Sequence, residues 1–148
     1  MKSKIMPPTY FMIFLLLSII LHFLIPVKNI IHSPYSYSGF IFIIIGIILN
    51  LAADKAFKES KTTVKPYEQP TSLKTDGTFR ISRHPMYLGM TFILLGTAIF
   101  LGSIITFIFP VLFIMISELL YIPYEEKNLE EAFGEQYKEY KKNIRRWI

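Results

Sequence analysis

The residues best suited to chemistry lie close together in residues 80–89. Arg80 and Arg83 carry the planar guanidinium groups that grip carboxylates and phosphates. Pro85 is well suited to open a helix, and it biases His84 toward an extended backbone. The unpaired amides of a first helical turn carry partial positive charge, which favours an anionic ligand. This string therefore predicts an anion-binding site at the start of a helix.

Each of these residues also has an ordinary structural explanation. Arginines at a membrane edge set the topology, and a tyrosine such as Tyr87 belongs to the aromatic belt of the interface. A single histidine at an interface, such as His84, is usually only solvated. The functional hypothesis therefore rests on the whole string, in which the Tyr87 hydroxyl is able to reach the same region as the arginines.

A second polar cluster, Tyr124 with Glu125 and Glu126, closes a long apolar run. Acidic residues at that depth cost free energy unless they are paired or functional. Either glutamate therefore forms a salt bridge to one of the two arginines or belongs to a site, and both interpretations stay open. Glu118 lies one to two turns deeper. It is a candidate functional residue, or it has a structural partner such as a neighbouring hydroxyl.

Four apolar runs must position these clusters, and they predict an all-α integral membrane protein with four transmembrane helices. A helix needs about 20 residues to cross a bilayer core, so the third run is short. Gly102 and Ser103 predict a tight turn and hence a helical hairpin, which brings Glu125 and Glu126 beside His84. The predicted spans are residues 10–26, 38–54, 86–101 and 104–122.

Two glycines predict how the third span packs. Gly89 and Gly96 fall two turns apart on one face of that helix. Small residues at this spacing let a neighbouring helix approach closely. We expect this use to be structural.

Composition agrees with a membrane protein of one domain, residues 1–148. Of these residues 52% are hydrophobic and 18% charged, which is too apolar for a soluble domain of this size. The absence of cysteine excludes disulfides and thiol nucleophiles. The net charge is +5, and most lysines and arginines lie in residues 55–84 and 125–148, so both segments are predicted to face the cytoplasm. This placement favours contact with lipid and gives no nucleic-acid partner.

The tail, residues 125–148, predicts an amphipathic helix. Its apolar residues recur at steps of three and four, which is the period of one helical face. We expect this helix to lie along the membrane surface or to fold back over the loop. The residues of the apolar stripe are Leu129, Phe133, Tyr137, Tyr140, Ile144 and Trp147.

Three stretches in the second half of the chain resemble the isoprenylcysteine carboxyl methyltransferase family and its phospholipid methyltransferase relatives. They are residues 73–80, the string Arg83-His84-Pro85-Met86-Tyr87-Leu88-Gly89, and residues 125–140 with the paired glutamates, Phe133-Gly134 and Tyr137 with Tyr140. The first half matches only as generic membrane helices.

The resemblance implies a membrane enzyme that uses S-adenosylmethionine to methylate a carboxylate or amine of a lipid-like or prenylated substrate. It implies no metal, and it places the active site at the cytoplasmic face of the membrane. Separately, the abundance of isoleucine and lysine favours a prokaryotic plasma membrane. The catalytic residues it implies are Arg83, Glu125 and Arg145. The cofactor-binding residues it implies are His84, Tyr87, Leu88, Gly89, Tyr124, Glu125 and Glu126.

Two other function classes stay open. Membrane sterol reductases carry a similar arginine-histidine-proline string and use NADPH, but they have an asparagine where Met86 stands, and they are longer. A membrane scaffold would use the basic loop only to contact anionic lipid. Neither class accounts for the paired-glutamate tail. The acceptor and the oligomeric state do not follow from the sequence.

Overall fold

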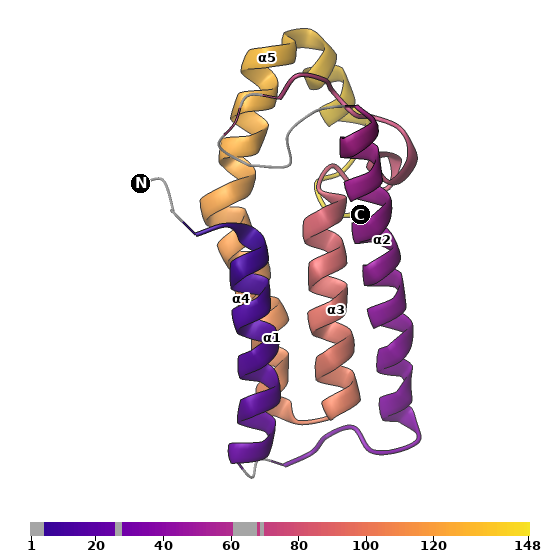
Figure 1. Cartoon of the computed structure of the whole chain (residues 1–148), viewed down its shortest axis with the longest axis vertical. Coiled ribbons are helices and arrows are strands. Elements are labelled where there is room, and N and C mark those ends of the chain that lie inside the picture. The colour runs from indigo at the N-terminus through magenta and orange to yellow at the C-terminus, as the bar shows by residue number, and fades with distance from the viewer. Residues whose placement is uncertain (1–4, 26–27, 61–67, 69) are drawn as a thin grey trace.

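A computed structural model describes residues 5–25, 28–60, 68 and 70–148 of the chain, and these residues form a helical bundle without a sheet (Figure 1). The bundle consists of α1 (Pro7–Leu24), α2 (Gly39–Glu59), α3 (Pro85–Leu101), α4 (Ile108–Ile116) and α5 (Ile122–Asn143). A π-helical turn, η4 (Ser117–Tyr121), joins α4 to α5. Short 3-10 helices occupy Tyr35–Ser38, Gly77–Arg80 and Ile104–Phe107.

Among the described residues, three stretches are long and apolar enough to cross a membrane: Pro7–Leu24, Tyr35–Glu59 and Ile104–Asn143. The prediction of a multi-pass helical protein is therefore confirmed for three of the four spans. The remaining span is the third one along the chain, α3. It has 17 residues and a length of about 26 Å, against a hydrocarbon core of about 30 Å. It lies alongside the other helices (Figure 1).

The predicted bounds of the spans need correction at their polar ends. α1 begins at Pro7, earlier than predicted, and residue 26 lies outside the described residues. α2 continues through Asp54 to Glu59, because an (i, i+4) ion pair between Asp54 and Lys58 supports the added turn. Of the predicted loop 55–84, residues 61–67 and 69 lie outside the described residues.

α2 and α3 pack so closely that glycine is required on both sides. A Cβ added at Gly96 would lie 2.5 Å from the Gly39 carbonyl oxygen, and one added at Gly46 would lie 2.5 Å from the Gly89 carbonyl oxygen. Ordinary van der Waals contact begins near 3.4 Å. The predicted close approach at Gly89 and Gly96 is thus confirmed, and the partner is a matching glycine pair on α2.

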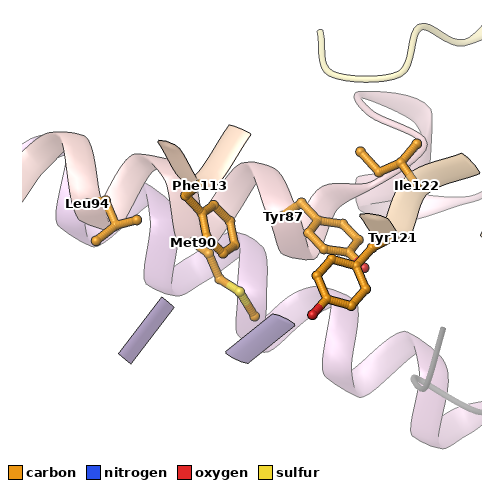
Figure 2. Close-up of a cluster of buried hydrophobic side chains, with 6 residues drawn as sticks. All are labelled: Tyr87, Met90, Leu94, Phe113, Tyr121 and Ile122. Atoms are coloured by element: carbon orange, nitrogen blue, oxygen red, sulfur yellow. The ribbon is translucent and has the colours of Figure 1, made fainter. Parts of the chain in front are cut away.

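A buried apolar cluster joins α3 to the last span beneath the polar end of the bundle (Figure 2). The rings of Tyr87 and Tyr121 stack with centroids 6.5 Å apart and an interplanar angle of 27°. This cluster fixes the position of Tyr87 relative to the π-helical turn. Its six members are Tyr87, Met90, Leu94, Phe113, Tyr121 and Ile122.

The tail helix folds back over the polar end instead of lying flat (Figure 1). Gly134 has φ 49° and ψ −121°, a conformation that glycine tolerates and that reverses the helix. The predicted apolar stripe is therefore confirmed in part. Its residues lie on two arms of α5 that join at Gly134, and Ile144 and Trp147 come after the helix ends at Asn143. Tyr137 and Tyr140 pack on Phe79 and Ala53, and the Tyr140 hydroxyl donates to the Phe79 carbonyl at 2.6 Å.

Candidate functional site

The site is built where three segments meet: the residues before α3, the start of α5 and the chain end after α5. His84 caps α3 with φ −126° and ψ 62°, outside the helical region, as the following proline favours. The Ser82 hydroxyl accepts from the His84 amide at 3.1 Å and donates to the Arg146 carbonyl at 2.9 Å. The Arg83 amide donates to the Arg145 carbonyl at 3.1 Å. Backbone contacts therefore tie the chain end to the histidine.

The hairpin brings His84 and Tyr87 to Glu125, as the tight turn predicts. His84 Nδ1 lies 3.1 Å from Glu125 Oε2, and the Tyr87 hydroxyl donates to Glu125 Oε1 at 2.6 Å. Both oxygens of Glu125 are thus engaged by residues at the start of α3. The His84 side chain is 4% exposed and that of Glu125 20%, so water screens this contact less than it would a contact at the surface.

Glu126 is the centre of a buried ion network. Arg83 Nη2 lies 2.8 Å from Glu126 Oε1, and His84 Nε2 lies 3.4 Å from the same oxygen. Arg146 binds Glu126 through two nitrogens, with Nε donating to Oε1 at 3.1 Å and Nη2 donating to Oε2 at 2.7 Å. The salt-bridge interpretation therefore applies to Glu126, with Arg83 as one partner, whereas Arg80 is exposed.

The network shifts the acid–base properties of His84, which lies just before α3. Burial alone would lower the pKa of His84, but hydrogen bonds to Glu125 and Glu126 and the charges of these carboxylates raise it above its ordinary value. The geometry therefore favours imidazolium facing carboxylate.

Arg146 and Trp147 are site residues that sequence reasoning missed. The sequence offers Arg145 and Arg146 side by side, and Arg145 was the predicted residue. The backbone after α5 is extended, with φ −120° and ψ 130° at Ile144, so successive side chains point to opposite sides. Arg145 is exposed, and Arg146 turns inward to Glu126.

Glu118 has the structural partners that were one of its two predicted interpretations, but they are not hydroxyls. Arg146 Nη1 donates to Glu118 Oε2 at 2.7 Å, and the Trp147 indole donates to Glu118 Oε1 at 2.5 Å. Both partners follow α5 in sequence and return to the π-helical turn only because the tail reverses at Gly134. No local pattern in the sequence indicates this contact.

A cavity of about 230 Å³ lies beside the network, and Arg83, His84, Tyr87 and Glu125 line it. Its remaining wall is largely apolar and comes from α1, α2, the central loop, α3 and α5. The apolar lining includes Met6, Pro7, Phe57, Leu73, Met86 and Met90. The Arg83 Nε atom is buried and has no hydrogen-bond partner among the described residues.

The other predicted residues do not line this cavity. Gly89 faces α2, where an added Cβ would meet Asn50, and Leu88 is buried. Tyr124 is 37% exposed and Arg145 is exposed. Their predicted contacts with a cofactor or substrate stay predictions.

Glu126 belongs to a different surface from Glu125. Together with Arg146 it lines a second, polar cavity of about 540 Å³ between the two arms of α5, near Gly134 and Lys141. The ion network thus separates this polar cavity from the apolar one. The two adjacent glutamates therefore have different environments, which the sequence could not show.

Comparison with known proteins bears on what this site does. Residues 35–136 match the phospholipid methyltransferase family. The chain is 33% identical over 115 residues to protein-S-isoprenylcysteine O-methyltransferase A of Arabidopsis thaliana, covering 76% of this chain and 58% of the relative. It is 32% identical over 111 residues to a probable protein-S-isoprenylcysteine O-methyltransferase of Oryza sativa subsp. indica, covering 74% and 58%.

A bacterial relative is named for a different activity. The chain is 35% identical over 74 residues to methanethiol S-methyltransferase of Pseudomonas deceptionensis, covering 49% of this chain and 27% of the relative. No solved structure matches. The chain spans a little over half the length of the plant relatives. The predicted resemblance to methyltransferases is confirmed, and the match reaches into the first half of the chain, which sequence reasoning had left generic.

Proposed function

The chain belongs to the phospholipid methyltransferase family, and from this membership we propose that it is an S-adenosylmethionine-dependent methyltransferase that acts on a lipid-like or prenylated acceptor. The observation that carries the proposal is the contact of His84 and Tyr87 with Glu125 at the wall of an apolar cavity. A carboxylate held by a histidine and a tyrosine beside such a cavity is typical of a ligand site.

The residues present suit S-adenosylmethionine. Its ammonium and sulfonium groups are cationic, and Glu125 offers a carboxylate at the cavity wall. Its carboxylate requires a donor, and Arg83 lines the same cavity with its Nε unpartnered among the described residues. We propose that Glu125, held in place by His84 and Tyr87, contacts the cationic part and that Arg83 contacts the anionic part.

The chemistry asks little of the protein beyond alignment. The cofactor supplies a methyl group on a sulfonium, which is already a strong electrophile. The protein must orient the acceptor and exclude water, and the apolar walls at Met86 and Met90 serve the second purpose. A carboxylate acceptor is ionised at neutral pH and requires no base. An amine must first lose a proton, and Glu125 is then the group placed to take it.

The walls of the cavity support a lipid-like acceptor. Pro7 and Pro8 at the start of α1 and Met90 on α3 line it, so it borders helices whose other faces expose large apolar side chains. The plant relatives are named for isoprenylcysteine and the bacterial one for methanethiol. We propose that the acceptor reaches the cavity from the membrane and that the cofactor enters from the cytoplasm, where lysine and arginine concentrate.

Cofactor binding is the first test. Calorimetry on the purified full-length protein in detergent is expected to show binding of S-adenosylmethionine. Glu125→Gln and His84→Ala should each weaken binding by about tenfold or more, because each removes a charge-assisted contact. Glu139→Gln is the matched control, since this glutamate is exposed on α5. Folded wild-type protein that binds no cofactor would refute the proposal.

Methyl transfer is the second test. Protein incubated with S-adenosylmethionine labelled at the methyl group and with a total lipid extract should place label in one lipid species. Synthetic prenylcysteine and long-chain amines, tested separately, distinguish carboxylate from amine acceptors. Equal label with wild type and with Glu125→Gln would show that this site does not carry the transfer.

A further inference from the structure

The end of the tail, residues 144–148, reaches from the segment before α3 to the π-helical turn. At one end the Arg145 and Arg146 carbonyls accept from Arg83 and Ser82. At the other end Arg146 and Trp147 both donate to Glu118. The tail therefore covers the ion network and is anchored at two places.

We infer that Glu118 is a positioning residue: by holding Arg146 and Trp147 it docks the tail and thereby fixes Glu126 beside His84. The inference deepens the proposed function and rests on it, because it assigns Glu118 to the support of the same site. Glu118 does not line the cavity and acts only through the tail.

The geometry of Arg146 makes this support rigid. A guanidinium is planar, and its five donors have fixed directions. Arg146 directs Nε and Nη2 to Glu126 and Nη1 to Glu118, so the position of one carboxylate constrains the other. Since Glu126 also contacts Arg83 and His84, the constraint extends to the cavity wall.

Glu118 stands on an unusual piece of backbone. The π-helical turn Ser117–Tyr121 interrupts a long helix, and π turns are rare and frequently lie at functional sites. The same turn carries Tyr121, which stacks on Tyr87 at the cavity. A carboxylate within a mainly apolar helix is costly unless it is used, and Glu118 uses both of its oxygens on the tail.

Trp147 gives the tail a second connection to the site. Its ring packs against the cluster that contains Tyr87 and Met90, two residues of the cavity wall. Its indole nitrogen is held by the carboxylate that also holds Arg146. One glutamate thus couples an ionic and an apolar contact.

Trp147 is the single tryptophan of the chain, so its fluorescence reports the docking of the tail without any ligand. In Glu118→Ala we expect red-shifted emission and stronger quenching by acrylamide than in wild type. The substitution removes a charge from an apolar helix, so it should not hinder membrane insertion. Glu139→Ala is the matched control and should leave the emission unchanged. Unchanged emission and quenching in Glu118→Ala would overturn the inference, whether or not the protein binds cofactor.

The second readout is cofactor affinity, which loss of stability alone would not change in folded protein. Glu118→Ala should weaken S-adenosylmethionine binding by about tenfold, as expected when a coupled network loses a member. Glu118→Gln, which still accepts a hydrogen bond, should recover part of the affinity. Adding Glu118→Ala to Arg146→Met should weaken binding no further, and additive effects would refute action through Arg146. If wild type binds no cofactor, the proposed function fails while the fluorescence result still decides the docking role.

Discussion

The interface between α2 and α3 and the ion network above it hold the same molecule together by opposite means. At the interface, Gly39 and Gly46 face Gly96 and Gly89, and the contact is backbone against backbone with no charged group. In the network, Glu126 is held by Arg83, Arg146 and His84, three long or aromatic side chains from two other segments. The first contact fixes the frame by excluding side-chain volume. The second fixes the site through charge.

This difference predicts different failures. Removing a side chain from the lipid-facing side of the frame should cost little, whereas adding one at a glycine should separate the helices. In the network, removing a side chain should cost much stability, because the loss of one partner leaves buried charges uncompensated. Three experiments test the contrast, from the largest expected effect to the smallest.

Glu126→Ala should have the largest effect. It leaves Arg83, His84 and Arg146 without their shared carboxylate, and breaking a buried ion pair costs about 3–5 kcal/mol. Unfolding by a denaturing detergent, followed by circular dichroism, measures the free energy. The matched control is Lys58→Ala, which breaks an exposed pair with Asp54 and should cost less than about 0.5 kcal/mol. Equal effects of the two substitutions would show that the buried network contributes no more to stability than an exposed ion pair does.

Gly96→Val should follow, with a loss of about 1–3 kcal/mol from overpacking. The new side chain has no room, because even its Cβ would lie 2.5 Å from the Gly39 carbonyl oxygen. The same unfolding measurement applies. Ile44→Ala on the exposed face of α2 serves as the control and should remain near wild type. Wild-type stability of Gly96→Val would mean that the two helices are not held by close contact.

The pH dependence of stability should show the smallest effect. The pKa of His84 is raised in the folded protein, so its contribution is fully present below about 6.5, the ordinary histidine value, and is lost as pH rises through the folded pKa. Melting temperatures should therefore fall on the alkaline side of that value. His84→Gln should flatten this part of the profile. A profile that is the same in both proteins would show that His84 does not titrate against Glu125 and Glu126.

Much of the frame followed from local pattern. The apolar runs predicted the helices, and the glycines at 89 and 96 predicted a close helix contact, because spacing along one helix decides which side chains share a face. The Gly102-Ser103 turn predicted that His84 would meet Glu125, since two helices joined by so short a turn must run side by side. The third apolar run is short for a crossing helix, and α3 is correspondingly short.

The support of the site did not follow in the same way. Glu125 and Glu126 are neighbours with the same side chain, yet one lines the apolar cavity and the other the polar one. Arg145 and Arg146 are also neighbours, and only Arg146 turns inward. Alternation along an extended chain or around a helix says that neighbours differ, but not which of them faces the protein.

The sequence by itself determined the membrane-embedded helical bundle, the hairpin and the meeting of the histidine string with the paired glutamates. Each of these depends on hydrophobic length or on the short turn that makes two helices run side by side. The tertiary structure decided the reversal of α5 at Gly134, the choice of Arg146 over Arg145 and the contact of Glu118 with the tail. These join residues about 20 to 30 positions apart, and they depend on where a folded chain end arrives, which no local spacing records.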